Sequence, residues 1–102
     1  MRFLPLDKLI NLHDGYRRAF KIDQLEILLL QEAGKVWAVS SRCPHQEQSL
    51  IDAEIIDEQL LCPRHHFAFE LANDGVQVDG LCASLKVFAT AYEGNEIGIL
   101  LP

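Results

Sequence analysis

The sequence predicts an all-β fold, and two features of its 102 residues indicate it. Short apolar runs alternate with turn signals such as Asp14-Gly15 and Gly94-Asn95. No stretch shows the sustained 3.6-residue apolar periodicity of a long amphipathic helix. This pattern favours a β-sandwich or β-barrel built from antiparallel strands.

In the first half of the chain, Phe3-Leu4 predicts a short strand that ends at Pro5, followed by a helical turn or loop over residues 6–12. Further strands are expected at 16–22, 25–30 and 36–39. The last of these delivers the chain to a loop that contains the first cysteine.

In the second half, strands are expected at 55–56, 59–61, 67–69, 84–92 and 96–100. Asp57-Glu58 predicts the turn of one hairpin, and Glu93-Gly94-Asn95 predicts that of another. Repeats, low-complexity segments and linkers do not interrupt this order, which indicates one domain over residues 1–102.

Composition excludes several classes of partner. Nine basic residues against fifteen acidic ones give a formal charge of −6, which disfavours nucleic acid and anionic membranes. Apolar runs are too short to cross a bilayer, and the N-terminus does not read as a signal peptide. Three cysteines argue against a disulfide framework. We therefore expect a cytoplasmic protein.

The most informative motifs are Cys43-Pro44-His45 and Cys62-Pro63-Arg64-His65, separated by residues 46–61. Each pairs one cysteine with one histidine, and the interval has room for two strands that return the second loop beside the first. Two thiolates on one iron and two imidazoles on the other are the ligands of a mixed-ligand [2Fe–2S] cluster.

With these motifs the chain resembles the Rieske family, specifically its small soluble ferredoxins, over essentially its whole length. Ser41-Arg42 before the first motif fits the family pattern, as does the aromatic run of Phe67-Ala68-Phe69 followed by Asn73-Asp74-Gly75. The departure is His66, where glycine is usual. A histidine there tolerates positive φ less well than glycine.

The resemblance implies a role for each motif residue. Cys43 and Cys62 would bind the inner iron, and His45 and His65 the outer iron, of one [2Fe–2S] cluster per chain. It also implies a Rieske-like antiparallel β-sandwich or barrel. A cluster-binding subdomain, at about residues 41–80, would be inserted in the β base.

By the same resemblance, the protein is a soluble one-electron carrier and not itself an enzyme. The implied partners are a flavin-containing reductase as electron donor and a terminal oxygenase, or a related redox protein, as acceptor.

Three other interpretations of the motifs remain open. One is the small subunit of an assimilatory nitrite reductase, many of which share the fold but lack the metal ligands. Another is a zinc-stabilised interaction module, although zinc fingers usually group cysteines with cysteines. The third is nucleophilic catalysis by a Cys–His pair, which would not require the pattern twice.

The remaining chemistry-bearing residues favour structural roles. His66 is expected at the rim of the second loop and His13 at the surface. Cys82, in a mostly apolar run, predicts a buried structural thiol. Trp37 is expected in the core, and Phe67 and Phe69 on one strand face under the cluster loop.

We predict a low midpoint potential. Respiratory Rieske proteins brace their loops with a disulfide at the positions of Gln48 and Arg64, and donate hydroxyl hydrogen bonds from the positions of Phe67 and Phe69. Phenylalanine has no such donor to stabilise the reduced state. Within the range of about −150 to +300 mV, spectroelectrochemistry should place this protein at the low end. A midpoint well above zero would contradict the ferredoxin interpretation.

Overall fold

The computed structural model describes residues 2–44, 48–63 and 67–102 of the protein and confirms the all-β fold class. Its strands are β1 (Arg2–Lys8), β2 (Arg17–Ile22), β3 (Leu25–Glu32), β4 (Lys35–Ser40), β5 (Glu54–Ile56), β6 (Gln59–Leu61), β7 (Ala68–Glu70), β8 (Val76–Gln77), β9 (Val87–Phe88), β10 (Thr90–Glu93) and β11 (Glu96–Leu101). Two single-turn 3₁₀ helices accompany them, η1 (Leu9–Asn11) and η2 (Leu71–Asn73). Within the described ranges, no helix is long and apolar enough to span a membrane.

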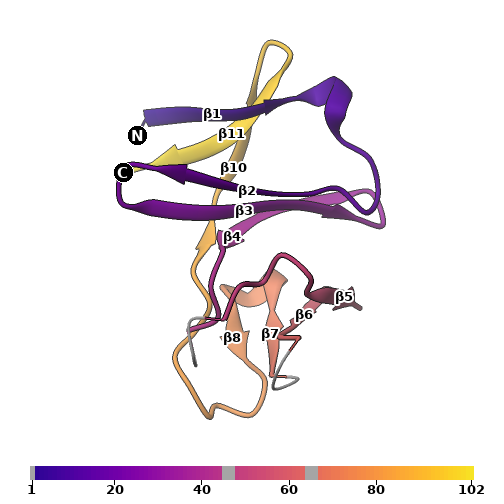
Figure 1. The fold of residues 1–102 in the computed structure, drawn as a ribbon, viewed down its shortest axis with the longest axis vertical. Coiled ribbons are helices and arrows are strands. Elements are labelled where there is room, and N and C mark those ends of the chain that lie inside the picture. The colour runs from indigo at the N-terminus through magenta and orange to yellow at the C-terminus, as the bar shows by residue number, and fades with distance from the viewer. Residues whose placement is uncertain (1, 45–47, 64–66) are drawn as a thin grey trace.

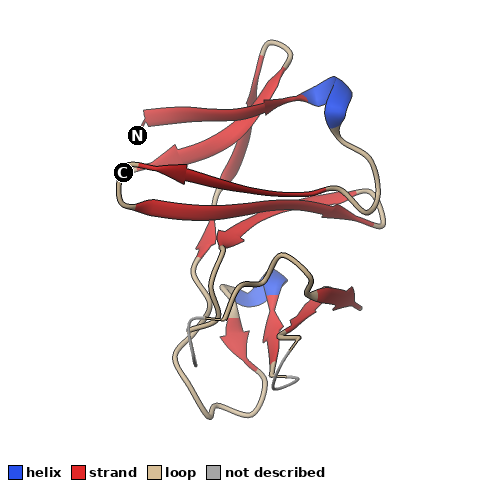
Figure 2. Ribbon diagram, viewed as in Figure 1, coloured by secondary structure: helices blue, strands red, loops and turns tan. Residues whose placement is uncertain are grey.

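The strands form three antiparallel sheets, with orders β1-β11-β10, β2-β3-β4-β9 and β5-β6-β7-β8. We call the last of these the small sheet. Figure 1 and Figure 2 show the first two sheets together at one end of the molecule and the small sheet at the other. The chain passes from β4 into the small sheet and returns from it into β9.

The central strand β3 is covered on both of its faces. Four consecutive residues, Ile27–Leu30, have no exposed surface. Successive side chains on a strand point to opposite faces, so Ile27 and Leu29 join one core cluster, whereas Leu28 and Leu30 join the other. An uninterrupted apolar run is what burial of both strand faces requires.

The two core clusters lie on either side of this strand. One joins the first two sheets and contains Tyr16, Ile27, Leu29, Ala38, Ile97 and Ile99. The other joins β3 and β4 to the small sheet and contains Leu28, Leu30, Val39, Cys43, Leu50, Ala53, Leu60, Cys62, Phe69, Leu71 and Leu85. Both motif cysteines therefore belong to the core that holds the small sheet against the rest of the protein.

The predicted end of the N-terminal strand, at Pro5, is wrong. The strand continues through Pro5 to Lys8, and only Leu9–Asn11 form a helical turn. Proline is tolerated because β1 is an edge strand, where a missing N–H need not cost a hydrogen bond within the sheet. The pairing with β11 shifts register between Pro5 and Asp7.

The single strand expected over 84–92 is divided into two. Val87–Phe88 pair with β4, whereas Thr90–Glu93 pair with β11 in a different sheet. The chain changes sheet at Ala89, which a pattern of apolar residues alone does not reveal. The predicted hairpins at Asp57-Glu58 and at residues 93–95 are confirmed.

An ion pair and a tight backbone contact connect the small sheet to its surroundings. The Lys35 ammonium of β4 contacts the Glu58 carboxylate in the β5–β6 turn. Further along, the Leu85 N–H donates to the Gly75 carbonyl at 2.8 Å. Gly75 has φ of +72°, and a Cβ there would lie 2.0 Å from the Leu85 carbonyl oxygen. This position therefore requires glycine.

A buried carboxylate fastens β1 to the start of β2. The Tyr16 hydroxyl donates to Asp7 Oδ2 at 2.5 Å, and Asn11 Nδ2 donates to Asp7 Oδ1 at 2.8 Å. The Lys8 N–H also donates to this carboxylate, and Arg18 lies 3.4 Å from it. These hydrogen bonds, chiefly that from Tyr16, lower the Asp7 pKa from 3.8 to about 2.

We predict that Tyr16→Phe lowers the free energy of unfolding by about 1–3 kcal/mol at neutral pH, because the buried carboxylate loses a charge-assisted donor. Since the folded-state pKa of Asp7 is depressed, its contribution is present above pH 4 and lost as pH falls toward 2. Denaturant unfolding at neutral pH and near pH 2 should show that the difference in unfolding free energy between wild type and variant is smaller in acid. Tyr92→Phe, at a tyrosine 57% exposed, is the control and should match wild type.

Candidate metal centre

The two motif cysteines are buried where two loops leave the strands. Cys43 follows β4 after a short connection and is 1% exposed, whereas Cys62 directly follows β6 and is fully buried. None of the three cysteines of the chain is in a disulfide. The fold thus brings two thiols from distant parts of the sequence into one apolar cluster.

The two loops close in the same way. The Cys43 N–H donates to the Gln48 carbonyl at 2.7 Å, and the Cys62 N–H donates to the Phe67 carbonyl at 2.9 Å. Outside each closure lies an antiparallel pair, Arg42 with Ser49 in the first loop and Leu61 with Ala68 in the second. In both loops a buried cysteine therefore occupies the first position of a turn that closes five residues later.

The predicted histidine ligands lie, in sequence, between the residues that close each loop. His45 and His65 lie outside the described residues, and so do Arg64 and His66. Sequence alone places His45 two residues after the first cysteine and His65 three residues after the second.

The first loop is anchored to β3 by its backbone and by the Arg42 side chain. The Ser41 N–H donates to the Glu26 carbonyl at 3.0 Å, and the Leu50 N–H donates to the Ser41 carbonyl at 2.8 Å. Arg42 Nε lies 3.1 Å from Glu26 Oε2. These contacts fix the position of Cys43 relative to β3.

Aromatic residues lie in or against the cluster that contains the thiols, as predicted for Phe67 and Phe69, whereas Trp37, expected in the core, is only partly buried. Phe69 is fully buried in the cluster that contains both cysteines, and the partly buried Phe67 and Trp37 pack against it. His13 is exposed, also as predicted. This packing keeps water from the sulfur atoms of the site.

Cys82 differs from its prediction. It is half-buried and packs against the edge of the cysteine-containing cluster instead of lying within it. Burial raises the pKa of its thiol, and the nearby Cys62 contributes in the same direction. The loop that carries Cys82 runs along the surface, so an apolar sequence there does not imply full burial.

Sequence analysis missed Gln77. In the run Val76-Gln77-Val78 an alternating pattern ordinarily turns the valines inward, but here Val76 and Val78 are 39% and 47% exposed while Gln77 is 2% exposed. Its side-chain Nε2 is buried and has no hydrogen-bond partner in the described part of the chain. The only sequence signal is a polar residue in an otherwise apolar strand.

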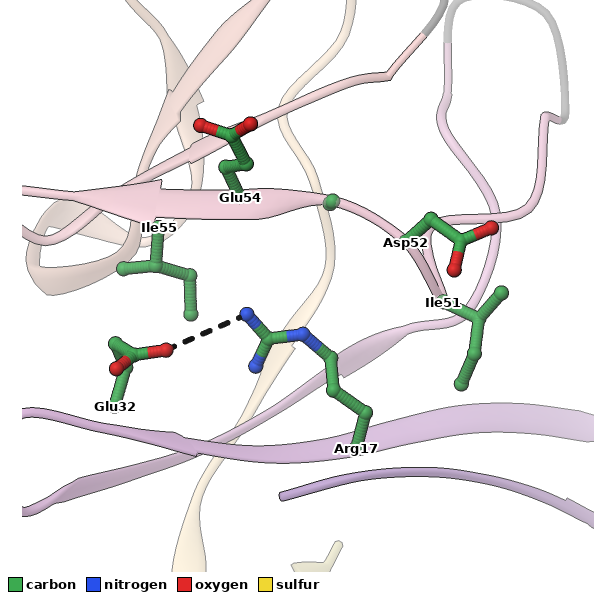
Figure 3. A pocket seen from close by; sticks show the side chains of 7 residues that line it. Arg17, Glu32, Ile51, Asp52, Glu54 and Ile55 are labelled. Atoms are coloured by element: carbon green, nitrogen blue, oxygen red, sulfur yellow. Dashed lines mark ion pairs between the residues drawn. The ribbon is translucent and has the colours of Figure 1, made fainter. Parts of the chain in front are cut away.

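A cavity is lined by residues other than the cysteines. It is an open crease of about 630 Å³ between the second sheet and the segment that leads into β5, lined by Arg17, Glu32, Ile51, Asp52, Ala53, Glu54 and Ile55. Figure 3 shows Arg17 and Glu32 paired across one side of it, at 3.6 Å, while Asp52 and Glu54 project from the opposite segment. A smaller hollow of about 280 Å³ lies beside Cys43 and Pro44.

The residues present fit a [2Fe–2S] cluster. Two buried thiols in an apolar setting suit thiolate ligation of iron, and an unpartnered amide donor nearby suits a site with acceptor sulfur atoms. Within 2–44, 48–63 and 67–102, no three potential ligands gather to hold a metal. The described residues thus bring two candidate thiol ligands, Cys43 and Cys62, into one apolar cluster.

Comparison with known proteins agrees with this chemistry. A relative from Xanthobacter autotrophicus (strain ATCC BAA-1158 / Py2), the ferredoxin component of an alkene monooxygenase system, is 28% identical over 89 residues, covering 85% of this chain and 71% of the relative.

Two solved structures share the fold. One is the ferredoxin of carbazole 1,9a-dioxygenase from Nocardioides aromaticivorans IC177, with a TM-score of 0.79, 24% identity and 97% coverage of both chains. The other is a putative NADH-dependent nitrite reductase small subunit from Mycobacterium tuberculosis, with a TM-score of 0.82, 19% identity and coverage of 96% and 93%.

The decisive match is to a family profile. The profile of the Rieske [2Fe-2S] domain matches residues 3–89, which include both Cys–His motifs and all of the small sheet. The chain therefore belongs to the Rieske [2Fe-2S] domain family.

Proposed function

We propose that this protein is a one-electron carrier that passes electrons from a flavin-containing reductase to a terminal oxygenase. The observation that carries the proposal is the pair of equivalent loops, each beginning with a buried cysteine, within a chain of the Rieske family. Two similar proteins are named as ferredoxins of a monooxygenase and a dioxygenase system. A ferredoxin transfers electrons and transforms no substrate of its own.

The proposed ligands are Cys43 and Cys62 for the inner iron and His45 and His65 for the outer iron. Burial of both cysteines supports the inner assignment, because thiolate sulfur is protected there from water and oxidation. The segment 41–80 is then the cluster-binding subdomain, and the small sheet is its scaffold.

When bound, the cluster supplies a site that accepts and releases one electron. The chain determines where that happens and at what potential. Cys43 and Cys62 are held by backbone closures, and Phe69 is buried in the same apolar cluster. The neutral imidazoles of His45 and His65 would add less negative charge than two thiolates, which makes reduction easier.

The net negative charge of the protein comes entirely from the proposed subdomain. Residues 41–80 contain eight acidic and two basic residues, whereas the rest of the chain contains seven of each. The whole formal charge of −6 therefore belongs to the part that would face a redox partner. A basic docking surface on the oxygenase or reductase complements it.

The nitrite reductase interpretation is the second candidate. Its support is the similarity to the Mycobacterium tuberculosis structure, which at 19% identity indicates the fold alone. Both complete Cys–His motifs favour the electron carrier over a structural subunit that lacks ligands. The family match favours iron and sulfide over a zinc-stabilised module.

We predict two iron and two acid-labile sulfide per chain, lost in Cys43→Ser and Cys62→Ser because thiolate ligands are removed and ligation is coupled to folding. Cys82→Ser, which changes the third cysteine, is the matched control and should retain the full complement. Iron and sulfide assays with the visible absorption spectrum provide the measurement. Loss of the cluster in Cys82→Ser, with retention in the other two, would overturn the ligand assignment.

The histidines provide a second, independent test. His45→Ala and His65→Ala should each lose the Rieske spectrum, because imidazole nitrogen on the outer iron distinguishes this cluster from one with four cysteines. His66→Ala and His13→Ala are the controls and should keep it. Electron paramagnetic resonance of the reduced proteins reads this out. Unchanged spectra in both ligand variants would exclude the assignment.

Electron transfer to the partner should depend on salt and on the charge of the subdomain. The Debye length falls from about 30 Å at 0.01 M to about 3 Å at 1 M, so stopped-flow rates should fall across this range. Glu54→Lys, an exposed change in the subdomain, should lower the low-salt rate several-fold. Glu93→Lys, an exposed change outside it, should have little effect. Equal effects of the two variants would exclude a local acidic docking surface.

A further inference from the structure

Gln77 is buried in β8, and only the oxygen of its side-chain amide is hydrogen-bonded within the described residues. Its Oε1 accepts a hydrogen bond from the Leu81 N–H at 2.7 Å, whereas its Nε2 has no partner among the described residues. Almost all buried polar groups in proteins are hydrogen-bonded, so an unpartnered amide donor in a core calls for an explanation. The bond to Leu81 also fixes the amide, because exchanging Oε1 and Nε2 would bring two donors together.

The unpartnered donor lies on the face of the small sheet that covers the cysteines. Gln77 pairs across strands with Phe69, which in turn pairs with Leu60. Residues directly opposite in neighbouring strands share a face, and alternation places Cys62 on that same face, two residues after Leu60. Leu60, Phe69 and Cys62 are all buried in the cluster that contains Cys43.

The acceptors that this face lacks are those that a bound cluster provides. Phe69, directly opposite Gln77, and Leu60, one strand further on, have no acceptor in their side chains. Thiolate and sulfide sulfur atoms accept N–H hydrogen bonds in iron–sulfur proteins.

We propose that Gln77 donates a hydrogen bond from Nε2 to a sulfur of the [2Fe–2S] site and so sets its potential. The inference rests on the proposed function, since it requires the cluster. Phe67 and Phe69 have no hydrogen-bond donor in their side chains. Gln77, one strand away, supplies a donor that those positions do not. Gln77 would act through this hydrogen bond to sulfur and would not bind iron itself.

The measurable consequence is the midpoint potential. A donor to sulfur stabilises the reduced state, which carries more negative charge, and therefore raises the potential. Gln77→Leu and Gln77→Met remove the donor without adding charge, and both should shift the midpoint to lower values. Iron and sulfide content should remain at the wild-type level, because no ligand is changed.

The matched control is Gln59→Leu. Gln59 lies on β6 of the same sheet, two strands from β8 and one residue from Leu60, and so faces the opposite side of the small sheet. Spectroelectrochemistry should give Gln59→Leu the wild-type potential. A midpoint unchanged in both Gln77 variants, or lowered equally in Gln59→Leu, would overturn the proposal. A general loosening of the sheet would instead lower the cluster content or the melting temperature.

A spectroscopic test on the unaltered protein remains informative if the variants fold poorly. Protein labelled with ¹⁵N at the glutamine side-chain amide is reduced and compared with unlabelled protein by pulsed electron paramagnetic resonance. A ¹⁵N coupling that disappears in labelled Gln77→Met supports the proposal. A coupling absent from the wild type, or retained in that variant, contradicts it. Wild-type protein that holds no iron and sulfide would instead refute the proposed function.

Discussion

The fold depends on one strand that is buried on both sides. Ile27–Leu30 of β3 face two separate cores in alternation, one shared with the first sheet and one shared with the small sheet. Because the cysteines belong to the second of these cores, the position of the metal site is tied to packing on β3. A substitution at Ile27 or Leu29 would disturb the first core and one at Leu28 or Leu30 the second, since each interior is close-packed. The rest of the molecule is arranged around this strand.

A second constraint acts through hydrogen bonds near the cysteines. Each loop closes on the N–H of its own cysteine, and the first loop is also fastened to the Glu26 carbonyl. The thiols are thus held by backbone geometry as well as by apolar packing. A site built this way confines the sulfur atoms to a small volume, which favours rapid electron transfer with little rearrangement.

Much of this could be predicted from sequence because the signals are local. The hairpin at Asp57-Glu58 and the two Cys–His motifs each depend on a few adjacent residues with a definite chemistry. The division of residues 84–92 at Ala89 could not be predicted, because it depends on which sheet receives each half. The continuation of β1 through Pro5 depends likewise on that strand being an edge.

The inward orientation of Gln77 was hidden for a related reason. A pattern of valine, glutamine and valine predicts burial of the valines. The side of the sheet that faces the core is instead set by Phe69 on the neighbouring strand β7 and by Leu60 on β6 beyond it. A polar side chain facing inward contradicts the pattern unless the interior offers it a partner. Such a conflict between local pattern and fold is therefore a useful sign of a functional site.

The close contact between Gly75 and Leu85 also has a consequence for evolution. It joins the two ends of the segment 76–84, so that changes within that segment need not move β7 or β9. Past β8, the chain there is mostly exposed. An insertion at the exposed Ala83 and Ser84 would therefore displace neither strand and would leave the Leu81 N–H bonded to Gln77, provided that position 75 stays glycine. The surface beside the metal site is thus free to diversify between lineages while the scaffold stays the same.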